Sequence, residues 1–378
     1  MVRSFSFPIL LVSLLFVTIS LSSLNTQTPL WLTKYDFLVW QVGIVGSSYF
    51  VGNLVGALIA NWLISKFNVK KTYAGTCVLF ALATLGMGLS ISLVCWSFWR
   101  FLIGVACAIT WIIVESCILV TSRSKNRGQM FAVYMTVYYL GTVFGQGLLR
   151  YFPKTVIYFA LVIVLLMILA ILFIFFTSYH LPVRKKKIFS IKPMLMYQPA
   201  RLGLIGCVVA GMVIGAIYSL LPAYYEYLGF SDDKVANWMI LVIASGLIAQ
   251  IPVGYLADRY GTLWVLVVDS ALFILACFMI INEYFVVLST MVIGASIYTV
   301  YPLSMAWACS TVRKQDIVLM NQTMLLVNTI GSLIAPAIIS IFMNALGNNY
   351  LFISFIVIAL YFVAVLVWNS KKYTGITE

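Results

Sequence analysis

The stretch GYLADRYG at residues 254–261 decides the architecture expected of this chain, and NWLISKFN at residues 61–68 is a degraded copy of it. The two copies begin 193 residues apart in a chain of 378 residues. Each copy is a short polar segment between long apolar runs. This spacing predicts an internal duplication, with an N-terminal half at 1–177, a basic linker at 178–200 and a C-terminal half at 201–378.

The composition is that of a membrane protein. Hydrophobic residues make up 63% of the chain and charged residues 9%, whereas a soluble domain has about 25% charged residues because its surface faces water. The net charge of +13 does not indicate nucleic-acid binding, because the basic residues lie at the ends of apolar runs and form no basic stripe with aromatic residues. We therefore expect the lipid bilayer as a partner and no nucleic acid.

The apolar runs predict an all-α membrane protein with twelve transmembrane helices in two pseudo-symmetric six-helix bundles. A β-barrel would need short alternating strands, and these runs are too long and too continuously apolar for that. The first run is interpreted as an uncleaved helix and not as a signal peptide. The helices are expected at 7–31, 39–64, 73–94, 97–120, 129–149, 154–177, 201–228, 235–257, 263–281, 284–310, 317–345 and 349–369.

The distribution of Lys and Arg tests this count. With the N-terminus in the cytoplasm, 18 of the 23 Lys and Arg fall in inner segments, including the run 184–187. The outer segments hold four, namely Lys34, Arg150, Lys154 and Lys234, and Arg100 falls inside a helix. Short cytoplasmic loops are enriched in basic residues. The bias supports an even number of spans, with both termini cytoplasmic.

Residues for metal, redox or catalytic chemistry are sparse. The seven cysteines lie in or beside apolar runs without a CxxC pair, and the one histidine, His180, borders the basic linker. Neither a nucleophile–base pair nor a paired metal motif is visible. We expect no enzyme activity, no metal and no cofactor. A phosphate-binding Gly-rich loop with Lys-Ser/Thr is also absent from the sequence, which excludes ATP as the energy source within this chain.

The halves, the central basic loop and the signature between helices 2–3 and 8–9 resemble the major facilitator superfamily. The second copy of the signature matches that family at Gly254, Asp258, Arg259 and Gly261 and departs from it after Gly261. In the family this hinge latches the two halves on the cytoplasmic side, and the resemblance implies that role for Asp258 and Arg259. We expect Gly254 to allow close helix approach, Gly261 to adopt a positive φ, and Asp258 to cap a helix or pair with a cation.

The first copy is weaker. Ser65 stands where the family has Asp, and Asn61 and Asn68 replace glycines, while Lys66 fits the pattern. Ser65 can still cap a helix, and Asn68 tolerates a left-handed backbone. This hinge is expected to keep its shape without its acid, and the second hinge is expected to be the stronger latch.

A more specific likeness covers predicted helices 4 and 5. The segments 111–116 (WIIVES), 127–128 (RG) and 134–146, with its Tyr, Gly and Gln pattern, resemble the YcaD-like bacterial subgroup. This resemblance implies a transporter of the bacterial cytoplasmic (inner) membrane but does not narrow the cargo. Drug antiporters of the superfamily carry Gly-Pro in helix 5, whereas here Gly145 is followed by Gln146. We still expect Gly141 and Gly145 to pack against another helix.

Three ionisable residues fall inside predicted spans, where charge is costly and usually functional. Arg100 opens helix 4 in the family's Arg-x-x-x-Gly pattern, which implies proton coupling or the holding of an anionic group. Its alternative is to extend to the outer interface beside Trp96 and Trp99. Glu115 is a candidate proton carrier, or else a structural group near the cytoplasmic end. Asp269 lies in peripheral helix 9 and is expected to pair with a cation or to support the second hinge.

Polar side chains concentrate in predicted helices 1, 4, 5, 7, 10 and 11, while helices 6 and 12 are almost purely apolar. This layout is typical of helices around a central site. Besides Arg100 and Glu115, the residues predicted to line it are Asn25, Tyr138, Gln146 and Asn328.

The resulting hypothesis is a monomeric secondary transporter that works by alternating access on a small neutral or amphiphilic organic solute, with protons as a candidate coupling ion. Arg100 leaves an anionic solute open. The alternatives are a facilitated uniporter, a translocase of lipids or amphiphiles, and a membrane receptor or scaffold without transport activity.

Overall fold

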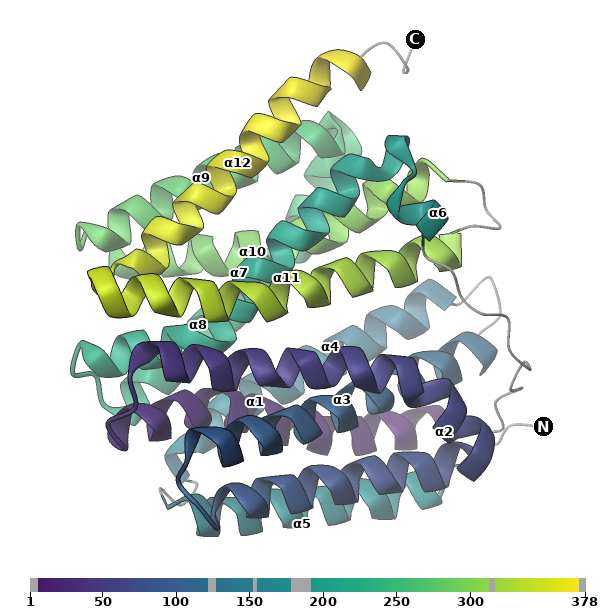
Figure 1. The fold of residues 1–378 in the computed structure, drawn as a ribbon. Helices are drawn as coiled ribbons and strands as arrows, with labels where there is room; N and C mark the ends of the chain where they lie inside the picture. Colours follow the sequence, from purple (N-terminus) through teal and green to yellow (C-terminus); the bar gives the residue numbers. More distant parts are fainter. Residues whose placement is uncertain (1–5, 122–126, 152–154, 178–191, 313–316, 374–378) are drawn as a thin grey trace. The chain divides into compact units, whose positions relative to one another are not determined.

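The computed structural model describes residues 6–121, 127–151, 155–177, 192–312 and 317–373. Within these ranges the regular structure is helical (Figure 1). The predicted 184–187 basic cluster, the larger part of the predicted linker and both chain ends lie outside them. The α-helices are α1 (Ser6–Lys34), α2 (Val39–Met87), α3 (Leu93–Thr121), α4 (Arg127–Leu148), α5 (Val156–Phe175), α6 (Lys192–Leu195), α7 (Arg201–Tyr227), α8 (Asp232–Tyr260), α9 (Thr262–Ile281), α10 (Val286–Ser310), α11 (Ile317–Leu346) and α12 (Tyr350–Tyr373), with short 3-10 turns at Leu149–Tyr151 and Gln198–Ala200.

The all-α prediction is confirmed, and most helix bounds lie within a few residues of those expected. Among the described residues, ten helical segments are long and apolar enough to cross a membrane. The almost purely apolar character predicted for helices 6 and 12 is confirmed, because α5 and α12 contain the two most hydrophobic of these ten segments.

The connection between predicted helices 2 and 3 is shorter than the expected polar hinge, because both helices extend to a single kink residue. The segment labelled α2 consists of two helices that meet at a sharp kink at Asn68, whose φ of 65° and ψ of 169° are not helical (Figure 1). The Oδ1 atom of Asn68 accepts a hydrogen bond from the backbone N–H of Lys71 at 3.1 Å, so Asn68 caps the second part of α2. The positive φ expected for Asn68 is confirmed. Ser65, expected as a cap, instead donates to the Trp62 carbonyl at 2.7 Å.

The chain forms two compact units. Unit 1 consists of Met1–Phe37, Ile44–Lys187 and Gly229–Asn237, and unit 2 of Leu38–Gly43, Ile188–Leu228 and Trp238–Glu378. Each unit takes most of one predicted half and a short segment from the other half of the sequence. The boundaries proposed at 177 and 200 stay predictions, since residues 178–191 lie outside the described ranges.

In unit 1, α1 packs against α4 through small residues. A Cβ atom added to Gly145 would lie 2.6 Å from the Ile19 carbonyl oxygen, and one added to Gly141 would collide with the Thr18 hydroxyl. The close approach lets Ser22 and Ser23 of α1 donate to carbonyl oxygens of α4, at 2.7 Å and 2.8 Å. The packing predicted for Gly141 and Gly145 is therefore confirmed.

In unit 2, the corresponding helix pair is α7 and α11, and it uses the same device. A Cβ atom on Gly215 would lie 2.5 Å from the Ser332 carbonyl oxygen. Here the donors are on α11: Ser332 Oγ bonds the Gly211 carbonyl at 2.9 Å, and Asn328 Nδ2 bonds the Cys207 carbonyl at 3.0 Å. Each unit thus holds its first and fifth spans together by small residues and side-chain donors to backbone oxygens.

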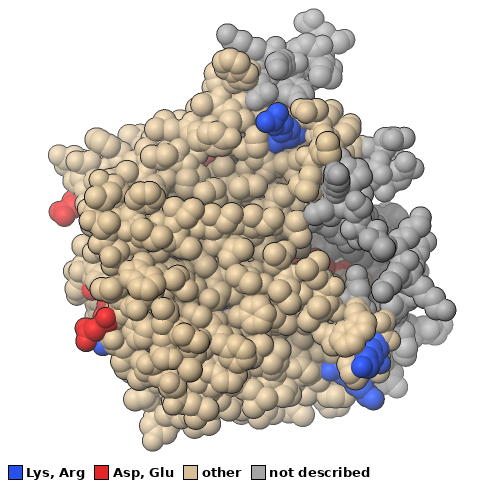
Figure 2. Space-filling view, viewed as in Figure 1, with Lys and Arg blue, Asp and Glu red and all other residues tan. Residues whose placement is uncertain are grey.

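The face of the protein in Figure 2 is largely free of charged side chains, and the Lys, Arg, Asp and Glu in view lie mainly at its margins. Large apolar side chains such as Leu58, Ile248 and Val357 are 73%, 71% and 60% exposed. Such a surface is unfavourable in water but matches the hydrocarbon interior of a bilayer.

Candidate functional site

Arg100 is the most enclosed charged side chain predicted for the site. It lies near the start of α3 and is 4% exposed. Its Nη2 donates a hydrogen bond to Asn25 Oδ1 of α1 at 2.9 Å. Its guanidinium carbon lies 5.0 Å from the centroid of the Tyr49 ring in α2, within cation–π range. Arg100 and Asn25, predicted separately, are therefore in contact.

Two glycines explain why Tyr49 can reach Arg100. A Cβ atom on Gly104, one turn after Arg100, would collide with the Tyr49 carbonyl oxygen, and one on Gly52 would collide with the Phe101 carbonyl oxygen. The backbones of α2 and α3 therefore touch at this level, which brings the Tyr49 ring over the guanidinium. The alternative in which Arg100 extends to the outer interface beside tryptophans is wrong, because the side chain points between α1 and α2.

The Arg100 guanidinium is incompletely hydrogen-bonded. Its Nε and Nη1 atoms are enclosed and have no hydrogen-bond partner among the described residues. Glu115 is fifteen residues later in the same helix, about 22 Å along its axis, and does not compensate this charge directly. The ion pair found in the described part of the chain joins Lys34 and Asp232 at 2.6 Å and does not involve Arg100.

Glu115 and Tyr138 lie in a second polar group, at the contact between α3 and α4. Glu115 is half-buried and accepts a hydrogen bond from the Tyr134 hydroxyl at 3.4 Å. Trp111, one turn before Glu115, packs edge-on against Tyr138 with ring centroids 5.4 Å apart. The carboxyl group of Glu115 contacts the phenol of Tyr134, which suits exchange of a proton with a neighbouring group or water.

Gln146 of α4 is completely buried and makes three hydrogen bonds to α1. Its Nε2 donates to the carbonyl and hydroxyl oxygens of Ser22 at 2.9 Å and 2.8 Å. Its Oε1 accepts from the Thr26 hydroxyl at 2.9 Å. All polar atoms of this amide are engaged within unit 1, so the structure gives Gln146 the position of a link between helices. Asn328 occupies a similar position in unit 2, through its bond to α7.

The second hinge agrees with only part of the expectation. Gly261 has φ 89°, as predicted, and precedes α9. A Cβ atom on Gly254 would meet no described residue within 4 Å, so the close helix approach expected at Gly254 is not seen in this structure. Asp258 and Arg259 are exposed. Arg259 lies 5.4 Å from the Tyr260 ring centroid, and Asp258 forms no ion pair with a described residue.

In the first hinge, the Lys66 ammonium lies 5.0 Å from the Trp62 ring centroid. Its neighbour Ser65 bonds backward along the same helix. The latch role of both hinges stays a prediction.

Asp269 is 8% exposed, and its partners differ from those expected. The carboxylate accepts hydrogen bonds from Ser296 at 2.9 Å and Thr299 at 3.2 Å, both on α10. The expected cation is absent among its described partners, because two hydroxyl groups of the facing helix supply the donors. Asp269 thus joins α9 to α10.

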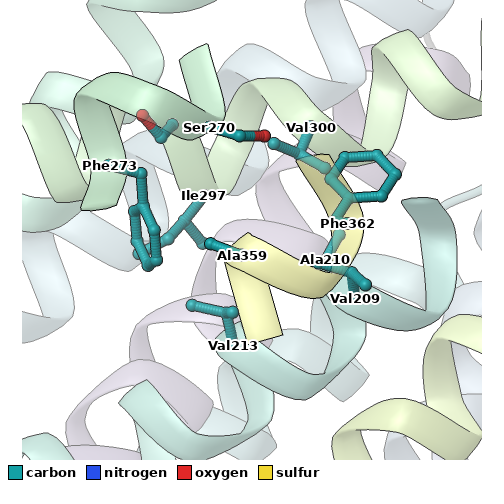
Figure 3. Close-up of a pocket in the computed structure, with 10 residues that line it drawn as sticks. Val209, Ala210, Val213, Ser270, Phe273, Ile297, Val300, Ala359 and Phe362 are labelled. Carbon is teal, nitrogen blue, oxygen red and sulfur yellow. The ribbon is translucent and has the colours of Figure 1, made fainter. Parts of the chain in front are cut away.

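A cavity in unit 2 lies between α7, α9, α10 and α12 (Figure 3). Its lining is apolar apart from two serines: Val209, Ala210, Val213, Ser270, Phe273, Ser296, Ile297, Val300, Ala359 and Phe362. It contains no charged side chain that could orient a polar solute. We therefore do not assign it as the solute site.

Sequence reasoning missed Tyr49 as a partner of Arg100, and Ser22 as a partner of Gln146. The signal for Tyr49 is its spacing to Asn53: two polar residues one turn apart in an apolar helix share a face. A single sequence does not show which neighbouring helix that face meets.

Comparison with known proteins adds the family. The model of the Major Facilitator Superfamily matches residues 10–249 and 235–377. A protein of Yersinia enterocolitica named as an uncharacterized MFS-type transporter is 43% identical, with 96% of each chain covered. The MFS-type transporter YcaD of Escherichia fergusonii is 37% identical, over 96% of this chain and 95% of that protein.

Solved structures show the same fold. The nucleoside transporter NupG superposes with a TM-score of 0.80 at 13% identity, over 96% of this chain and 99% of that one. A bacterial homologue of the human lysosomal transporter Spinster gives 0.82 at 13% identity, over 99% and 98%. At such identities the likeness concerns the fold alone.

Proposed function

Because the chain belongs to the major facilitator superfamily of membrane transporters, we propose that it is a secondary active transporter that moves a small organic solute by alternating access. In this mechanism two six-helix halves rock about a site near the middle of the bilayer. The proposal includes residence in the bacterial inner membrane, cytoplasmic termini and action as a monomer.

The observation that carries the proposal is the enclosed guanidinium of Arg100 within an apolar span. A cation at that depth is costly to maintain, and proteins keep such groups chiefly where a solute or an ion passes. Unit 1 places an amide and an aromatic ring beside it.

Alternating access predicts that one position becomes reachable from both sides of the membrane. We would introduce Tyr138→Cys into a protein whose partly exposed Cys95 and Cys309 are replaced by Ser. A membrane-impermeant maleimide added to either face of oriented vesicles should label the new thiol. Asn344→Cys, at an exposed position of α11, is the control and should react from one side only. Labelling of Tyr138→Cys from a single side would contradict alternating access.

Proton coupling through Glu115 is the finer part of the proposal. The carboxyl group is half-buried within the span and contacts a hydroxyl donor, Tyr134. With a solute identified by thermal-shift screening, Glu115→Gln should abolish proton-driven accumulation in proteoliposomes and preserve counterflow. Glu283→Gln, at an exposed position between α9 and α10, is the matched control. Accumulation that persists in Glu115→Gln would remove Glu115 as the coupling group, and a protein that never accumulates its solute would be a uniporter.

A further inference from the structure

The hydrogen-bonding capacity of Arg100 is mostly unused. A guanidinium group carries five N–H donors in one plane. One bond to Asn25 is present, while Nε and Nη1 are enclosed without a partner among the described residues. Buried donors without partners are rare in folded proteins, and those of a charged group are the most costly. Such a group indicates either a missing ligand or enclosed water.

The hydrogen-bond partner of Arg100 is the neutral side chain of Asn25, where a buried arginine usually pairs with a carboxylate. Asn25 has the size and shape of Asp but lacks the charge, and its Oδ1 lies 2.9 Å from Nη2, where a carboxylate oxygen would lie. The described residues around Arg100 therefore solvate the cation without neutralising it. A charge of this kind inside an apolar span favours an anion from outside the protein.

The free N–H groups of Arg100 are arranged to bind a carboxylate. Nη2 has two hydrogens, one on the edge shared with Nε and one on the edge shared with Nη1. Asn25 takes one of them, so whichever edge it uses, the other edge keeps two parallel N–H groups. Two parallel donors match the two oxygens of a carboxylate. The Tyr49 ring covers one face of the guanidinium and leaves its edges for ligands in the same plane.

We propose that Arg100 binds the carboxylate group of the transported solute, so that the cargo is an organic carboxylic acid in its anionic form. This inference rests on the proposed function and names its substrate class. Because the guanidinium is 4% exposed in this conformation, the carboxylate reaches it when unit 1 adopts a different one. Asn25 holds the guanidinium in place, and Tyr49 keeps it oriented.

The decisive variant is Asn25→Asp, which adds a carboxylate at the same position and of the same size. That internal carboxylate would pair with Arg100 and compete with a carboxylate from solution. The probes are acid and amide pairs that differ in charge and little in shape, namely benzoate with benzamide and lactate with lactamide. Binding to the purified full-length protein in detergent is measured as the shift in melting temperature over a concentration series.

For the wild type, we expect at least one acid to raise the melting temperature while its amide does not. Asn25→Asp should weaken the binding of that acid on the order of tenfold or more. The melting temperature of the ligand-free variant should equal that of the wild type or exceed it. Asn344→Asp adds the same charge at an exposed site on α11 and should bind the acid as the wild type does. Arg100→Lys keeps the positive charge but lacks the paired N–H donors of the guanidinium, so it should also weaken binding of the acid.

Two results would overturn the assignment. One is that no acid of the panel stabilises the wild type more than its amide. The other is that Asn25→Asp binds the acid as tightly as the wild type, which would leave Arg100 a structural cation. Neither result bears on two-sided labelling of Tyr138→Cys, so failure of the substrate class is distinguishable from failure of the transport mechanism.

Discussion

Replacing Gln146 with Leu tests whether this amide is a link between α1 and α4. Leu has a similar volume, so the change removes hydrogen bonds with little loss of packing. Three bonds are lost, two from Nε2 to Ser22 and one to Oε1 from Thr26. Hydrogen bonds between membrane helices contribute about 0.6 kcal/mol on average and about 1.7 at most. The free energy of unfolding should therefore fall by about 2 kcal/mol, with an upper limit of about 5.

The assay is equilibrium unfolding in mixed micelles, followed by circular dichroism and tryptophan fluorescence. Thr26→Val removes one of the three hydrogen bonds and should lower the free energy of unfolding by about 0.6 kcal/mol. In the double variant the shared bond is counted once, so its cost should be less than the sum of the two single costs. A loss below about 0.5 kcal/mol for Gln146→Leu would refute the reasoning and return Gln146 to the list of candidate solute contacts.

Further predictions concern positions whose surroundings differ sharply. Gly104→Ala should destabilise the protein by about 1–3 kcal/mol because the added Cβ atom meets the backbone of α2. Gly254→Ala adds a Cβ atom that meets no described residue and should be neutral or stabilise by up to about 1 kcal/mol through helix propensity. Equal melting temperatures for the two variants would contradict this contrast. Gly261→Ala places a side chain at φ 89° and should cost about 1–3 kcal/mol in the same unfolding assay, although nothing collides with it. Asp269→Leu removes the carboxylate acceptor of Ser296 and Thr299 and leaves Ser296 only the longer 3.4 Å contact to the main-chain oxygen of residue 269, so it should cost about 1–3 kcal/mol with solute flux unchanged. Lost flux in a folded variant would place Asp269 in the transport mechanism.

The sequence predicted the helices well because membrane spans are set by length and hydrophobicity, which are local properties. For example, the helix expected at 263–281 is α9, Thr262–Ile281. The segment after Ala60 was harder. Its polar residues are typical of a loop, yet helical geometry extends on both sides up to Asn68, because lysines and Ser65 tolerate it, and the chain turns at Asn68 alone.

The polar contacts were less predictable, because they depend on how each helix is rotated toward its neighbours. Arg100 and Asn25 were both identified, but their contact required the close approach at Gly104, and Tyr49 was missed for the same reason. The function of Gly254 was inferred from a motif, and its surroundings do not explain it. Gln146 and Asn328 were predicted to line a solute site because they are polar; the structure shows that they join helices, and their contact with a solute stays a prediction.

The serine contacts between paired helices have an evolutionary consequence. Ser22, Ser23 and Ser332 donate to main-chain oxygens of the facing helix, and every amino acid supplies such an oxygen. The bond to Thr142 therefore does not depend on the side chain at that position, whereas Gly145 and Gly211 must stay small because a Cβ atom there would meet the facing backbone. After a gene duplication, the two copies can diverge in most side chains and keep one common scaffold, which frees the remaining surfaces of these helices to adapt to new solutes.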